Sequence, residues 1–109
     1  MPKYLALFSY SHTAMSAMID NPADREAAVN KVVASVGARL ESMYWMFGPH
    51  DGLAIIDAPD SHTMAGISAA VSSTGAVTSE THELFTSADV AKILAKAGEA
   101  RSNFAQPGA

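Results

Sequence analysis

The chain has 109 residues, no cysteine and a formal net charge of −4 at neutral pH. Its length suits one domain with a single core, and the lack of cysteine excludes disulfides, cysteine-ligated zinc and thiol catalysis. Lys and Arg form no cluster anywhere in the sequence, so we expect no nucleic-acid partner.

Charged residues make up only 17% of the chain, below the share of about a quarter that is usual for soluble domains. A small protein with so few charges is expected to bury part of its surface against a partner. The apolar run near the N-terminus is too short for a signal-peptide core or a membrane span. We therefore expect a cytoplasmic protein without membrane contact.

The first predicted element is a strand over Lys3–Ser9, which is rich in aromatic and aliphatic residues and has no breaker. A short helix is expected over Thr13–Asp20. Asn21 and Pro22 then predict a second helix, with Asn21 as its N-cap and Pro22 in the first position. This helix carries four valines at helical spacing, before Gly37 ends it: Val29, Val32, Val33 and Val36.

A β-hairpin follows, with strands over Ala38–Phe47 and Leu53–Asp57 joined by a Gly- and Pro-rich turn. Simple alternation divides the first of these strands into two faces. One face would carry Leu40, Ser42, Tyr44 and Met46, and the other Arg39, Glu41, Met43, Trp45 and Phe47. Both faces become apolar toward the turn, so both are expected to be covered.

A third helix is expected to begin after Asp60 and to end at Gly75, with an apolar stripe of Met64, Ile67, Ala70 and Val71. A fourth strand over Ala76–Phe85 shows alternation. The capping sequence Thr86–Asp89 then starts a last helix, whose apolar positions are Val90, Ile93, Leu94 and Ala97. Periodicity is lost from Gly98 on, which predicts one domain over residues 1–97 and a flexible tail over 98–109.

The element order βαββαβ with an appended helix predicts an α+β, ferredoxin-like fold. In this fold the helices cover one face of a four-stranded antiparallel sheet. Because the strands carry apolar side chains on both sides, the other face also needs a cover. A second copy of the chain is the simplest one, which predicts a homodimer or a higher homo-oligomer.

Three segments resemble the GYD-domain family: MPKYLALFSYS at the N-terminus, GPHDGLAIIDAPD in the centre and GAVTSETHELFT near the end. The similarity extends from about Pro2 to Leu94. The family is named for a central Gly-any-Tyr-Asp turn; Gly48 and Asp51 match it, and His50 stands at the tyrosine position. The resemblance implies a dimeric α/β-barrel type of ferredoxin-like fold, related in architecture to small monooxygenases, and implies no reaction.

Two interpretations apply to the central turn. In the functional one, His50 is a general base or a metal ligand that Asp51 orients. In the structural one, Asp51 hydrogen-bonds the backbone of the turn, while Gly48 and Gly52 bracket the loop and supply its flexible geometry. We favour the structural interpretation.

Other candidate acid–base groups are few. His82 and Glu80 share one face of the fourth strand, where a carboxylate would raise the pKa of a histidine, although such pairs are often only solvated. His12 follows the first strand, at an edge where pockets open, whereas His62 is expected at the surface. The candidate catalytic residues are therefore His12, His50, His82 and Glu80. No spacing matches a metal-site template, so we expect no metal and no cofactor.

Two functional hypotheses follow. The first is a homo-oligomeric binding or assembly domain without an assignable reaction. The alternative is a cofactor-independent monooxygenase or isomerase that acts on a small apolar ring compound in a pocket between sheet and helices. The sequence leaves open whether the protein is an enzyme. A pocket that brings together two of the candidate groups would favour the alternative.

Overall fold

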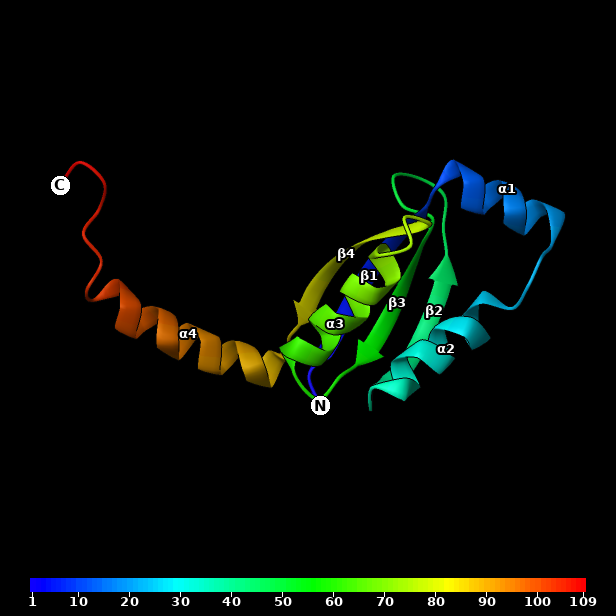
Figure 1. Cartoon of the computed structure of the whole chain (residues 1–109). Helices are drawn as coiled ribbons and strands as arrows, with labels where there is room; N and C mark the ends of the chain where they lie inside the picture. The colour runs from blue at the N-terminus through cyan, green and yellow to red at the C-terminus, as the bar shows by residue number, and fades with distance from the viewer.

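Four strands form one antiparallel sheet in the spatial order β2-β3-β1-β4, as the computed structural model of residues 1–109 shows (Figure 1). The strands are β1 (Lys3–Tyr10), β2 (Arg39–Trp45), β3 (Gly52–Asp57) and β4 (Val77–Leu84). The helices are α1 (His12–Asp20), α2 (Arg25–Ser35), α3 (Ser61–Ser72) and α4 (Ser87–Arg101). The α+β, ferredoxin-like arrangement predicted from the sequence is confirmed.

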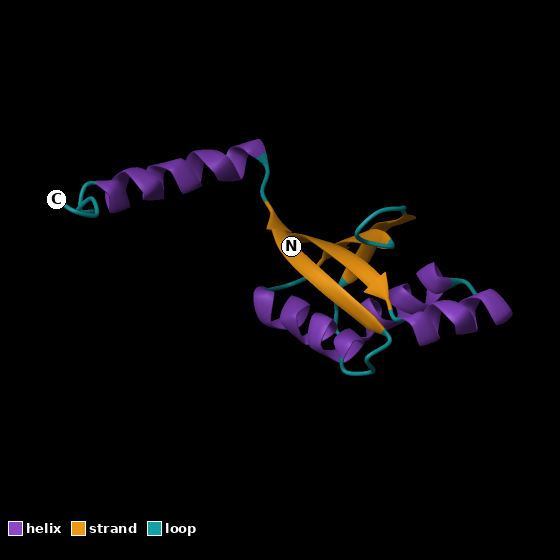
Figure 2. Ribbon diagram, turned by 90° about the horizontal axis from the view of Figure 1, so that it is seen from above, coloured by secondary structure: helices purple, strands orange, loops and turns teal.

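The helices α2 and α3 lie on one face of the sheet and leave the other face open (Figure 2). Each packs against the strand that follows it in the chain, α2 on β2 and α3 on β4. The connections are short, so each helix folds back on the sheet from which it came. The sheet therefore has a covered face and an open face, and these two names are used below.

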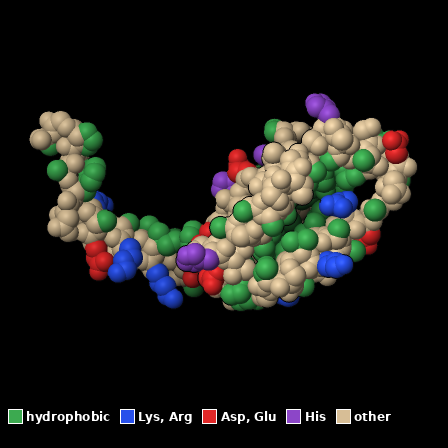
Figure 3. All heavy atoms as spheres, in the orientation of Figure 1, with side chains coloured by type: hydrophobic (Ala, Val, Ile, Leu, Met, Phe, Trp, Pro, Cys, Tyr) green, Lys and Arg blue, Asp and Glu red, His purple; other side chains and the backbone are tan.

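Helix α4 leaves the sheet after β4 and extends away from the rest of the chain (Figures 1 and 3). Its start is a capping box, in which Thr86 and Asp89 each accept the other's backbone N–H in a side-chain hydrogen bond of 3.1 Å. The helix exposes the apolar side chains Val90, Ile93 and Leu94. Neither α4 nor any other helix combines the length and apolar character needed to cross a membrane.

The end of α4 corrects one expectation. The helix continues through Gly98 to Arg101, so the loss of helical structure from Gly98 on was predicted wrongly. One glycine inside a helix costs only about 1 kcal/mol relative to alanine and does not end it. The division into residues 1–97 and 98–109 stays a prediction.

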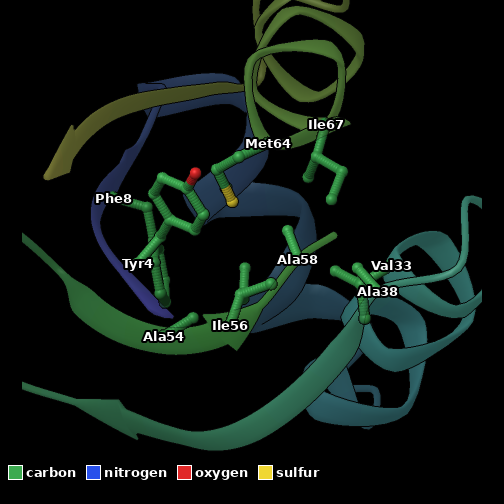
Figure 4. Packing of buried hydrophobic residues seen from close by; sticks show 9 residues of the cluster. All are labelled: Tyr4, Phe8, Val33, Ala38, Ala54, Ile56, Ala58, Met64 and Ile67. Atoms are coloured by element: carbon green, nitrogen blue, oxygen red, sulfur yellow. The ribbon is translucent and has the colours of Figure 1, made fainter. Parts of the chain in front are cut away.

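The core lies between the covered face and the two helices (Figure 4). Its buried members are Tyr4, Phe8, Val33, Ala38, Ala54, Ile56, Ala58, Met64 and Ile67. In Figure 4, Met64 and Ile67 point from α3 toward the sheet, and Val33 lies beside Ala38 on the α2 side. Full burial of one such aliphatic side chain contributes about 1.5–3 kcal/mol, so this layer is a large favourable term in the free energy of folding.

A β-bulge in β2 changes the faces that simple alternation predicts. The register shifts between Leu40, which pairs with Ile56, and Ser42, which pairs with Ile55. The extra residue, Glu41, moves Leu40 to the covered face, so its predicted place beside Ser42 and Tyr44 is wrong. A bulge inserts one residue into one strand only, and therefore exchanges the faces on either side of it.

The start of α2 also differs from the prediction. Asn21 is the C-cap of α1, because its backbone N–H donates to Ala17 O. Asp24 is the N-cap of α2, and its carboxylate accepts a hydrogen bond of 3.0 Å from Ala27 N. The predicted valine stripe of α2 is partly buried: Val33 is buried and Val29 packs on the core, whereas Val32 and Val36 are exposed.

Candidate functional site

The open face has an aliphatic centre. Four side chains from β1 and β3 form it, with Leu5 opposite Ile55 and Leu7 opposite Leu53. They are only partly buried, because no helix lies over them. An apolar centre of this kind is typical of a sheet face that packs against another sheet.

A buried carboxylate with two basic partners lies at one end of the open face. The Asp57 side chain is only 7% exposed and accepts hydrogen bonds from Lys3 Nζ at 2.8 Å and from Arg39 Nη2 at 2.6 Å. The bond from Lys3 is the main cause that lowers the pKa of Asp57, and the same bond raises the pKa of Lys3. Lys3 also pairs with Glu41 at 2.9 Å. This network joins the ends of β1, β2 and β3 and fixes their register.

The edge strand β4 contributes an ion-pair candidate beside the aliphatic centre. His82 Nε2 and Glu80 Oε2 are 2.9 Å apart, and their side chains are 54% and 56% exposed. The hydrogen bond to His82 is the main cause that lowers the pKa of Glu80. In neutral His82 this bond places the proton on Nε2 and leaves Nδ1 as an acceptor. The pair can exchange a proton, but both side chains face solvent.

His50 lies in the loop between β2 and β3, at the same end of the open face as Glu80. Its Nδ1 is 3.4 Å from Ser9 Oγ, and its charge is a minor cause of the lowered pKa of Glu80. His50 makes no hydrogen bond with Asp51. The two neighbours in sequence therefore do not form a catalytic dyad.

Asp51 ties the same loop to β1. Its Oδ2 accepts a hydrogen bond of 2.8 Å from Tyr10 N, and its own backbone N–H donates to Phe8 O at 2.8 Å. Gly48 has φ +132°, a conformation that favours glycine. Position 52 requires glycine for a different reason. A Cβ there would collide with the Phe8 ring and would lie 2.7 Å from Tyr44 O. Close packing, and not loop flexibility, is thus what requires glycine at position 52.

The remaining histidines lie apart from this group. His12 is the first residue of α1 and is exposed, and His62 is exposed in the first turn of α3. Among the four candidate catalytic residues, the structure joins only His82 and Glu80 directly and places His50 near them. No three His, Asp or Glu side chains gather in a way that could hold a metal ion.

A cavity of about 150 Å³ lies between α2, α3 and the covered face. Thirteen of its sixteen lining residues are hydrophobic, among them Phe8, Val29 and Val71. Figure 3 shows the corresponding hollow between the two helices, with hydrophobic walls and a basic side chain at its border. None of His12, His50, His82 and Glu80 lines this cavity. His82 and Glu80 lie on the opposite face of the sheet from this cavity, and His12 lies at the exposed start of α1.

Arg25 is the one charged residue in the cavity lining, and the sequence analysis did not single it out. A signal was present, because a basic residue in the first turn of a helix opposes the helix dipole. A residue that conflicts with the helix dipole in this way is typical of a functional position. The prediction of the helix start at Asn21 obscured this signal, since it placed Arg25 in the second turn.

A sequence profile of the GYD domain matches residues 4–94 of the chain. The chain belongs to the GYD-domain family. No curated protein matches its sequence. In this GYD domain, the two motif positions that the chain retains are Gly48, with its positive φ, and Asp51, with its bond to β1. The motif thus coincides with the point where the β2–β3 loop is attached to the centre of the sheet.

Proposed function

We propose that this GYD domain is a homo-oligomeric assembly domain, in which the open face of the sheet packs on a second copy of the chain. One observation carries the proposal: the aliphatic centre of Leu5, Leu7, Leu53 and Ile55 has no cover from its own chain. Packing a second sheet on it removes this apolar surface from water, which is the main favourable term in association.

The charges of the open face are compatible with contact between identical surfaces. Lys3 and Arg39 offset Glu41 and Asp57 within one network, which leaves Glu80 as the one further acid. The face then carries one net negative charge when His82 is neutral and none when His82 is protonated. Two such faces therefore repel each other little. A two-fold axis between them would give a closed dimer.

The size of the face suggests that α4 also takes part. Four strands of about seven residues cover roughly 19 by 23 Å, or about 440 Å² in projection, from the usual strand spacing and rise. A stable interface takes about 800 Å² of accessible surface from each partner. The exposed apolar side chains of α4, Val90, Ile93 and Leu94, would supply additional area if the helix reaches across to the partner.

Sedimentation velocity at micromolar concentration tests the proposal. We expect a dimer or a larger species, and a Leu7→Arg variant is expected to sediment as a monomer of 11.4 kDa. The matched control is Ala69→Arg, which places the same charge on an exposed position of α3. A wild-type protein that is monomeric throughout this range would refute the proposal. A Leu94→Asp variant tests separately whether α4 contributes to the dimer interface.

The alternative function is a cofactor-independent monooxygenase or isomerase. It requires acid–base side chains next to the cavity that binds the ring of the substrate. The cavity supports the binding of a small apolar ligand, because its walls are hydrophobic and its volume is that of one ring. The reaction has no such support, since none of the candidate acid–base groups lines the cavity. We therefore retain ligand binding, and not catalysis, as the second proposed property.

A further inference from the structure

We propose that the cavity between α2, α3 and the sheet binds a small aromatic carboxylate, with the ring in the cavity and the carboxylate on Arg25. This site lies within one chain and goes beyond the proposed assembly function. Ligand binding and oligomeric state can therefore be measured independently.

The volume and lining of the cavity set the size of the ligand. A dry apolar cavity of about 150 Å³ in another protein accommodates benzene, and the cavity here has a volume of about 150 Å³. Phe8 and Tyr10 form part of its wall and meet edge to face, with ring centroids 5.7 Å apart. Tyr10 is held in turn by stacking on Trp45. Such fixed aromatic walls suit a flat ring, because aromatic pairs favour edge-to-face or offset contacts.

The charge in the lining sets the chemistry of the ligand. Arg25 Nε is shielded from solvent and has no hydrogen-bond partner, and Arg25 takes part in none of the ion pairs of the chain. The carboxylate of the neighbouring Asp24 accepts a hydrogen bond from Ala27 N and forms no ion pair with Arg25. A buried donor without an acceptor is costly. A carboxylate would accept from this N–H and from a second guanidinium N–H in the forked geometry that arginine prefers.

No other charged side chain lines the cavity, so the site should distinguish anionic from neutral ligands of the same shape. Benzoate and benzamide provide this comparison, since benzamide is neutral and has one acceptor oxygen where benzoate has two. Isothermal titration calorimetry with the full chain is expected to give saturable binding of benzoate, one per chain. The affinity for benzamide should be lower by a factor of about ten, because a charge-assisted hydrogen bond is lost.

Three variants locate the site. Arg25→Gln is expected to bring benzoate binding down to the level of benzamide, whereas Lys31→Gln, a charge removed from an exposed position of the same helix, should leave it unchanged. Val71→Phe is expected to fill the cavity and abolish binding of both compounds. Circular dichroism checks that each variant is folded.

The comparison of benzoate with benzamide on the wild-type protein needs no variant and can refute the proposal by itself. Equal affinities, or no saturable binding of benzoate, would overturn it. Unchanged benzoate affinity in a folded Arg25→Gln protein would overturn it as well.

Discussion

The covered and open faces are built from alternate residues of the same strands, yet the chain buries only one of them. In β1, Tyr4 and Phe8 are buried under the helices, whereas Leu5 and Leu7 stay partly exposed. The covered face forms one wall of the cavity that Arg25 also lines, and the open face carries the pair of His82 and Glu80. Apolar residues on both sides of a strand thus build the core on one side and leave an uncovered apolar surface on the other.

The largest expected effect comes from a pair of neighbouring isoleucines on opposite faces. Ile56 is 2% exposed in the core, and Ile55 lies in the aliphatic centre of the open face. Ile56→Ala should lower the free energy of unfolding by about 2–5 kcal/mol, because it leaves a cavity in a packed layer. Ile55→Ala should cost much less in dilute monomer. Urea denaturation of both variants measures the difference.

Protein concentration sharpens this test. If Ile55 lies in a homodimer interface, the cost of Ile55→Ala grows as concentration favours the dimer, whereas the cost of Ile56→Ala stays constant. Equal losses for the two variants at every concentration would show that the open face is as much a part of the monomer core as the covered face.

Asp57 should give the next largest effect, since it holds three strands together at the end of the open face. Asp57→Asn should cost about 1.5–3 kcal/mol, the value of hydrogen bonds that involve charged groups. Lys3 and Arg39 are partly exposed and can turn to solvent, which keeps the loss below that of a fully buried pair. Thermal melts of Asp57→Asn beside Glu41→Gln, a more exposed member of the same network, measure this contribution.

The same network predicts how stability varies with pH. Because the pKa of Asp57 is lowered on folding, its contribution is present above about pH 3.9, the unfolded value, and is lost as the pH falls through the folded pKa. The pKa of Lys3 is raised, so its contribution is present below about pH 10.4 and is lost as the pH rises through the folded pKa. Asp57→Asn should flatten both limbs of a plot of Tm against pH. An unchanged profile would mean that other groups control it.

Local signals in the sequence predicted the elements and their order, because caps, glycines and apolar spacing agree along most of the chain. They missed the bulge at Glu41, since a strand that is apolar on both faces has no alternation to reveal an extra residue. They misplaced the start of α2, because Asn21 and Asp24 are both good caps and only the end of α1 decides between them. The role of Arg25 depends on three elements meeting around a cavity, which no local spacing encodes.

The loop of the family motif offers a smaller effect that separates two adjacent residues. Asp51→Ala removes the acceptor of Tyr10 N and should cost about 1–3 kcal/mol, the range for leaving a partly buried donor unpaired. His50→Ala loses only a long contact with Ser9 and should cost less than about 0.5 kcal/mol. Parallel thermal melts test the order. A larger loss for His50→Ala would reverse the structural assignment of the turn.

The smallest expected effect on the monomer belongs to Glu80 and His82 on the open face. Both side chains are about half exposed, and exposed ion pairs add little to stability because water and salt screen them. The pKa of Glu80 is lowered by His82, so this small contribution is present above the ordinary carboxyl pKa and fades as the pH falls through the folded value. Glu80→Gln should therefore leave the Tm of dilute protein unchanged.

In a dimer joined through the open face the same pair is covered and less screened, so Glu80→Gln should change the dissociation constant and its dependence on salt. Sedimentation at two salt concentrations measures that change, and a large loss of Tm in the monomer, with no effect on association, would place the pair in the fold and not in the interface.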